Sequence, residues 1–107
     1  MSSKTEFQQK TTRALEKRTT NDWRRVLMLV EGRRVVWSLL RALGHRQNAF
    51  VPGDPHATSY NCAMRAFGNY IEDFVRKADP AAYEQMEQEY KAEIKQLETD
   101  LKNVEDD

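Results

Sequence analysis

Three side chains in the sequence titrate near neutral pH and could carry acid, base or nucleophilic chemistry: His45, His56 and Cys62. A cysteine–histidine nucleophile needs both side chains within hydrogen-bond reach, and the six-residue separation of His56 and Cys62 does not place them face to face. Zinc requires four ligands at short spacings, a pattern that Asp54, His56 and Cys62 do not form. A glycine-rich phosphate loop is also missing. We therefore expect no enzymatic activity, no cofactor and no metal.

Carboxylates cluster at residues 72–73 and 84–93, where paired acids could act as general acid and base. The same clusters are typical of a solvated helix face, because Glu87, Lys91 and Lys95 follow the i, i+4 spacing of ordinary ion pairs. We interpret them as surface charge.

A net charge of zero conceals a strong asymmetry along the chain. Residues 1–46 carry eleven basic and four acidic side chains (+7), and residues 47–107 carry six and thirteen (−7). Arginines lie beside Trp23 and Trp37, and such groups can bind nucleic acid through phosphate contact and stacking. Both tryptophans also fit apolar helix stripes, and an acidic partner protein explains the arginines equally well. The candidate residues for binding a partner or nucleic acid are Arg24, Arg25, Arg33 and Arg34.

The composition of the 107 residues excludes several classes of protein. Apolar residues make up 39% and charged residues 32%, and the low counts of glycine and proline favour helices over turn-rich β structure. A single cysteine cannot form an intrachain disulfide, which suits the cytoplasm. No apolar stretch reaches the ~18 residues of a membrane span. The polar N-terminus lacks the apolar segment of a signal peptide.

Apolar periodicity predicts an all-α fold in which three helices form a small core and a long C-terminal helix extends beyond it. The predicted parts are a basic flexible arm at residues 1–20, a helical core domain at residues 21–79 and a long acidic helix at residues 80–107. The first firm helix is expected from Asp22, because good N-cap residues directly precede its apolar stripe.

Three glycines predict local features of the helices within the core domain. Glu31 and Gly32 predict a break before a second helix, and Gly44 predicts a left-handed cap at the end of that helix. Gly68 lies inside a third helix, expected at residues 58–78, and predicts the close approach of a neighbouring helix.

Two aromatic residues are expected in the core. Phe50, in the loop of residues 45–57, is expected to fill a space between the helices. Trp37 is expected to be buried between the second and third helices.

The last helix, expected from Pro80 to about Asn103, carries an apolar stripe at heptad spacing. At 1.5 Å per residue its 24 residues span ~36 Å, more than the other helices can cover. We therefore expect the stripe to pack on a second copy, with antiparallel pairing favoured, or on another protein. The alternative is a helix that folds back on its own core or frays. This stripe, the C-terminal stripe, consists of Tyr90, Ile94, Leu97, Leu101 and Val104.

Three segments of the chain resemble a family of small tailed-phage proteins. They are Glu31-Gly32-Arg33-Arg34-Val35-Val36-Trp37-Ser38-Leu39-Leu40 followed by Gly44 and Phe50, then Arg65-Ala66-Phe67-Gly68, then Ala78-Asp79-Pro80-Ala81-Ala82-Tyr83-Glu84-Gln85-Met86. The family occurs in podovirus-type phages of Gram-negative bacteria, including a Bordetella phage. The resemblance covers residues 22–90 and implies a gene among those for capsid, portal and packaging proteins. It implies no activity and no catalytic residue.

The leading hypothesis is a non-enzymatic virion or assembly component that acts in several copies at the portal vertex or inside the head. Its partners would be further copies of itself and other phage structural proteins, with no membrane involved. It would be found in the virion, and in the host cytoplasm during assembly. The alternative is a small nucleic-acid-binding regulator made during infection, which would bind nucleic acid non-specifically through its basic half.

Overall fold

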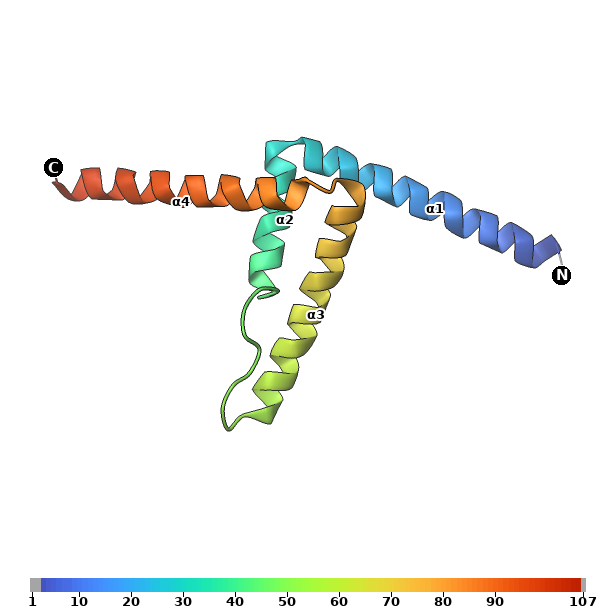
Figure 1. The fold of residues 1–107 in the computed structure, drawn as a ribbon, viewed down its shortest axis with the longest axis horizontal. Helices are drawn as coiled ribbons and strands as arrows, with labels where there is room; N and C mark the ends of the chain where they lie inside the picture. Colours follow the sequence, from blue (N-terminus) through green and yellow to red (C-terminus); the bar gives the residue numbers. More distant parts are fainter. Residues whose placement is uncertain (1–2, 107) are drawn as a thin grey trace.

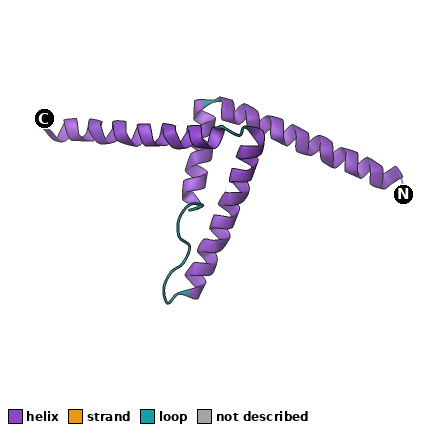
Figure 2. Ribbon diagram, viewed as in Figure 1, coloured by secondary structure: helices purple, strands orange, loops and turns teal. Residues whose placement is uncertain are grey.

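The computed structural model describes residues 3–106, and this range contains four α-helices and no strand (Figure 2). The predicted all-α fold class is therefore confirmed. None of these helices combines the length and apolar character that crossing a membrane requires. The helices are α1 (Ser3–Met28), α2 (Val30–Ala42), α3 (Pro55–Ala78) and α4 (Ala82–Asp106).

The molecule is extended. α2 and α3 form a hairpin, and α1 and α4 lie at one end of it and point in opposite directions (Figure 1). The principal extents are 73 × 41 × 16 Å and the radius of gyration is 19.3 Å, whereas a compact domain of this length has a radius of gyration of ~13 Å. Two arms therefore project from the core: the N-terminal arm, residues 3–19 of α1, and the C-terminal arm, residues 94–106 of α4.

The core is small and lies where the four helices meet. α2 buries Val36 and Leu40, and α3 buries Ile71 and Val75, each pair separated by one helical turn. Trp23 and Trp37 pack against this core without being fully buried. The other buried apolar residues are Leu27, Ala49, Ala78, Ala82, Tyr83 and Met86.

α1 is one continuous helix from Ser3, so the predicted helix start near Asp22 is wrong. Residues 3–19 are all exposed, and a fully solvated helix has no apolar stripe to reveal it in the sequence. The hydroxyl groups of Thr11 and Thr20 donate hydrogen bonds to carbonyls four residues back, which keeps these polar side chains within the helical geometry. The predicted flexibility of residues 1–20 stays a prediction, and residues 1–2 lie outside the described range.

The chain turns sharply between α1 and α2 at Leu29, not at the predicted break at Glu31-Gly32. Leu29 has an extended backbone conformation, with φ −96° and ψ 137°. Gly32 lies inside α2, where an added Cβ would clash with the carbonyl oxygen of Val26. The glycine therefore permits a tight corner between two helices and does not end either of them.

The loop between α2 and α3 follows the sequence expectation only in part. Gly44 adopts the predicted left-handed conformation, with φ 61°. α3 begins at Pro55, earlier than expected, because Asp54 accepts a hydrogen bond from the Ala57 backbone N–H as an N-cap. The prediction that Phe50 fills the core is wrong: its side chain is 63% exposed, and the neighbouring Ala49 is buried instead.

Trp37 lies between α2 and α4, which corrects the expected position between the second and third helices. Its ring contacts Tyr83 and Tyr90 of α4, at centroid distances of 5.4 and 5.9 Å. α4 begins at Ala82, after a turn that contains Pro80, and the N-terminal part of α4 crosses the hairpin. This crossing places the aromatic side chains of α4 on α2.

Candidate assembly surface

The C-terminal stripe continues a helix face that begins inside the core. Tyr83 and Met86 on this face are buried, at 2% and 1% exposure. Farther along α4 the same face is uncovered: Leu97 is 48%, Leu101 64% and Val104 71% exposed. The bundle therefore covers only the first half of the face, as the helix length predicts, and the rest lies in solvent along the C-terminal arm.

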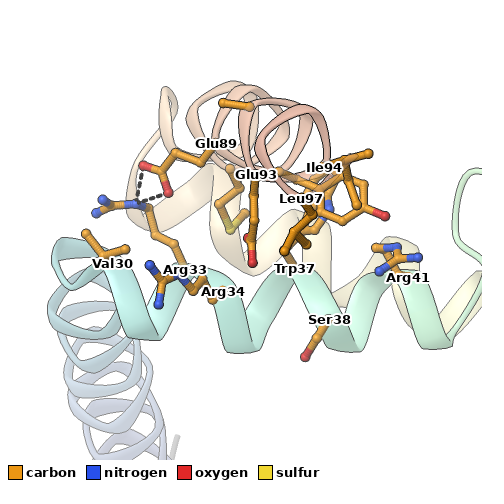
Figure 3. Close-up of a pocket in the computed structure, with 13 residues that line it drawn as sticks. Val30, Arg33, Arg34, Trp37, Ser38, Arg41, Glu89, Glu93, Ile94 and Leu97 are labelled. Atoms are coloured by element: carbon orange, nitrogen blue, oxygen red, sulfur yellow. Dashed lines mark hydrogen bonds and ion pairs between the residues drawn. The ribbon is translucent and has the colours of Figure 1, made fainter. Parts of the chain in front are cut away.

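A groove of about 870 Å³ lies where α4 leaves α2, next to the C-terminal stripe (Figure 3). We call it the corner groove. Its apolar lining includes Val30, Trp37, Tyr90, Ile94 and Leu97. Three residues of the C-terminal stripe, Tyr90, Ile94 and Leu97, thus contribute to the groove, and the exposed stripe continues from it.

The α2 wall of the corner groove is basic. Arg33 is neutralised within the fold: its Nε donates to Glu89 at 2.9 Å and its Nη1 to the Leu27 carbonyl at 2.8 Å. Arg34 and Arg41 also line the groove, are exposed, and form no ion pair within residues 3–106. The Arg41 guanidinium lies over the Tyr90 ring, 4.5 Å from its centroid. Glu93 of α4 also lines the groove and is exposed, so these two arginines and one carboxylate leave a net positive charge beside the apolar floor.

The indole N–H of Trp37 is a buried donor with no acceptor among the described residues. Buried polar groups in folded proteins almost always have a hydrogen-bond partner, and an unpaired one costs ~1–3 kcal/mol. Other atoms of the Trp37 side chain line the corner groove.

The four arginines predicted to bind a partner or nucleic acid do not act as one group. Arg24 donates from Nε to the Ala78 carbonyl at 3.1 Å and so holds the end of α3. Arg33 is only 8% exposed and its guanidinium is paired with Glu89, and its role in binding stays a prediction. Arg25 and Arg34 are exposed, and their role in binding stays a prediction.

A buried histidine, His45, links α2 to α4 where the two helices cross. His45 is 4% exposed; its Nδ1 lies 3.1 Å from the Leu40 carbonyl and its Nε2 lies 2.9 Å from the Tyr83 hydroxyl. A carbonyl can only accept, so Nδ1 donates to Leu40, and Nε2 shares a hydrogen bond with the Tyr83 hydroxyl and lies 3.5 Å from Glu72 Oε1. Burial raises the pKa of Tyr83 above its usual value. This triad joins the end of α2 to α4.

Arginines and carboxylates surround the Tyr83 ring. Arg46 and Arg76 stack on the ring at 4.8 and 4.6 Å from its centroid. Arg76 donates to Glu72 at 2.9 Å and to Glu84 at 3.1 Å, and the bond to Glu72 is the largest effect in raising the pKa of Arg76. The backbone N–H and then Arg76 lower the pKa of Glu84. The arrangement is structural, since every charged group faces an opposite charge.

The hairpin exposes a second apolar surface, which we call the hairpin face. Val35 and Leu39 of α2 are 58% and 48% exposed, and Tyr60 and Phe67 of α3 are 65% and 56% exposed. By helical phase, Val35 and Leu39 lie across α2 from Trp37, so the hairpin face lies on the side away from α4. Tyr60 and Phe67 share helical spacing with the buried Ile71 and Val75, so spacing alone does not distinguish these exposed residues from core residues.

The described residues contain no cluster of histidine, cysteine and carboxylate side chains that could hold a metal. The geometry thus defines a small all-α protein whose most distinctive features are uncovered apolar surfaces. The family model for Bbp19-like phage proteins matches residues 23–88, more than half of the chain, and the chain belongs to this family. No curated protein and no solved structure gives a significant match. Both projecting arms lie outside the matched range.

Proposed function

We propose that this phage protein is a non-enzymatic virion or assembly component that acts in several copies, at the portal vertex or inside the head of a podovirus-type phage. The observation that carries the proposal is the distribution of large apolar side chains. Among the described residues fifteen are exposed, whereas seven (Leu27, Val36, Leu40, Ile71, Val75, Tyr83 and Met86) are buried. Contiguous exposed apolar surface marks protein–protein interaction sites.

The charge distribution supports the same proposal. The exposed N-terminal arm carries five basic and two acidic side chains, and the C-terminal arm is acidic. A molecule with oppositely charged ends can contact acidic and basic neighbours at the same time. We place the protein in the virion, and in the host cytoplasm during assembly, with a gene in the virion and packaging region.

Quantitative mass spectrometry of gradient-purified virions tests this function. The protein is expected in a constant ratio to the major capsid protein across preparations, and enriched over its ratio in the infected-cell lysate. A phage that carries an amber codon at Trp37 supplies the matched control, since it tests whether particles lacking the protein form and package DNA. Virions free of the protein, together with normal particles from the amber phage, would overturn the proposal.

Non-specific nucleic-acid binding is the second candidate, favoured by the exposed basic side chains of the N-terminal arm. Fluorescence anisotropy with labelled duplex DNA at ~50 mM salt should then show binding that weakens steeply as salt rises. Reversing three charges in the full chain, Lys10→Glu, Arg13→Glu and Lys17→Glu, should abolish it. Absence of binding at this salt concentration would remove the candidate and leave an acidic protein surface as the partner of the arm.

A further inference from the structure

We propose that two copies of this chain pair antiparallel through the C-terminal stripe, so that the C-terminal end of each α4 occupies the corner groove of the other copy. The proposal rests on the proposed multi-copy function and names its first partner, a second copy. Three independent features of the described residues carry it: the symmetry of the stripe, the reach of the arm and the charge of the groove.

The stripe is nearly symmetric about Leu97. Tyr90 and Val104 lie seven residues before and after Leu97, whereas Ile94 lies three residues before it and Leu101 four residues after it. In an antiparallel pair centred on Leu97, Tyr90 lies opposite Val104 of the second copy, and Ile94 lies within one residue of the level of Leu101. Every apolar side chain of one stripe therefore meets an apolar side chain of the other, and the interface is self-complementary, as a two-fold axis requires.

The reach of the helix fits this register. Tyr90, which lines the corner groove, lies seven residues before Leu97, ~10 Å along the axis. Val104 lies seven residues after Leu97, the same distance in the other direction. An antiparallel partner therefore brings its last turn to the groove. One pairing fills two grooves and covers both stripes.

The charge of the groove selects which free helix end fits. The two projecting helices differ in charge: the first turns of α1 carry Lys4, Glu6 and Lys10, and the last turns of α4 carry Glu98, Asp100, Lys102 and Glu105. Helix N-termini are electropositive and C-termini electronegative. Arg34 and Arg41 at the groove repel the first end and attract the second.

Flanking charges modulate the pairing in both directions. In the proposed register Lys91 lies within two residues of the level of Glu105 of the second copy, both beside the stripe, and these pairs, formed twice in the dimer, attract. Glu93 lies nearly opposite Asp100, which repels. Raised ionic strength therefore screens opposing contributions, and the apolar stripe supplies most of the affinity.

Sedimentation velocity of the full chain over a concentration series is the test. We expect a monomer–dimer equilibrium, and we expect Leu97→Asp to give a monomer with unchanged helical content. Thr99→Asp places the same charge on the opposite face of α4 and should leave the dimer intact. Arg34→Glu with Arg41→Glu should weaken dimerisation by about tenfold or more, and adding Glu105→Arg should restore part of the loss.

A chain that is monomeric at every concentration, or a dimer that Leu97→Asp and Thr99→Asp affect equally, would overturn the proposed pairing. An arginine double variant that dimerises as tightly as the parent would overturn the placement of the helix end in the corner groove. The proposed function fails by a separate result, absence from virions. A monomeric chain that is nevertheless present in virions would overturn only the pairing, and would indicate that another virion protein covers the stripe.

Discussion

Gly68 is the residue at which the hairpin packs most tightly. A Cβ at this position would clash with the Cβ of His45 and approach the Cα of the same residue at 3.3 Å. Gly68→Ala gains ~1 kcal/mol in helix propensity but must displace the turn that holds His45, an overpacking cost of ~1–3 kcal/mol. We expect chemical denaturation to show a free energy of unfolding lowered by about 1–2 kcal/mol. Asn69→Ala, one residue along on the exposed side, should raise it or leave it unchanged. If Gly68→Ala and Asn69→Ala raised the free energy of unfolding equally, the tight packing at Gly68 would be contradicted.

Tyr83 is expected to make stability fall at alkaline pH. Burial raises the pKa of its hydroxyl, so the folded state holds this proton to a higher pH than the unfolded chain, whose tyrosines titrate near ~10. The contribution of Tyr83 is therefore fully present below that pH and is lost as pH rises through the folded-state pKa. Tyr83→Phe should flatten the decline of the free energy of unfolding above pH ~10. At neutral pH it should lower that free energy by about 1 kcal/mol, because His45 loses its partner.

Denaturant titrations at a series of pH values measure both effects of Tyr83. Tyr70→Phe is the matched control, since it removes a phenol that is 57% exposed and should keep the decline of the parent protein. If the free energy of unfolding of Tyr83→Phe falls with rising pH as steeply as that of the Tyr70→Phe control, the fall does not come from ionisation of the Tyr83 hydroxyl.

At the scale of elements, the N-terminal arm is a helix that contributes little to the fold. Residues 3–19 are all exposed. A chain that begins at Thr20 should therefore keep its free energy of unfolding within about 1 kcal/mol of the full chain. Circular dichroism should at the same time lose the helical signal of the arm. A drop of several kcal/mol in urea titrations would show that the arm packs on the core and is not a projecting element.

The core-forming helices could be predicted because each has an apolar periodicity. The pairs Val36 and Leu40, and Ile71 and Val75, repeat at helical spacing and are buried as that spacing predicts. The N-terminal arm has only a weak signal of this kind, because Phe7 and Leu15 are its only large apolar residues and both are exposed, so its spacing allows a weak helix as well as a flexible arm. Its polar residues are compatible with both a helix and a flexible segment.

The contacts between elements could be predicted only in part. The length of the last helix predicts that its stripe extends past the core, and the exposure of Leu101 agrees with this. The contact of Trp37 with α4, and the bond between His45 and Tyr83, join residues far apart in sequence. No local pattern encodes these pairings, because they depend on the angle at which α4 crosses the hairpin. Gly68 was the one sequence signal of a close approach near His45.

At the scale of the whole molecule, the fold consists of a small hub, where the four helices meet, and two arms that point in opposite directions (Figure 1). Pairing through the C-terminal arms would place the two hubs at either end of an antiparallel helix pair, with the basic N-terminal arms and the hairpin faces pointing outward. Such a dimer leaves further surfaces free for other proteins. The family match covers the hub, and both arms lie outside it.

Disulfide crosslinking tests the proposed pairing most directly, with each variant made in a Cys62→Ser background. In the antiparallel register Ile94→Cys faces Leu101→Cys of the other chain, whereas two Leu101→Cys sites lie eight residues apart, ~12 Å along the axis and too far for a disulfide. We predict that oxidation crosslinks a mixture of the two variants into mixed dimers and crosslinks neither variant alone. Dimers formed by each variant alone would indicate parallel helices, and an absence of crosslinks in the mixture would contradict the pairing of α4 altogether.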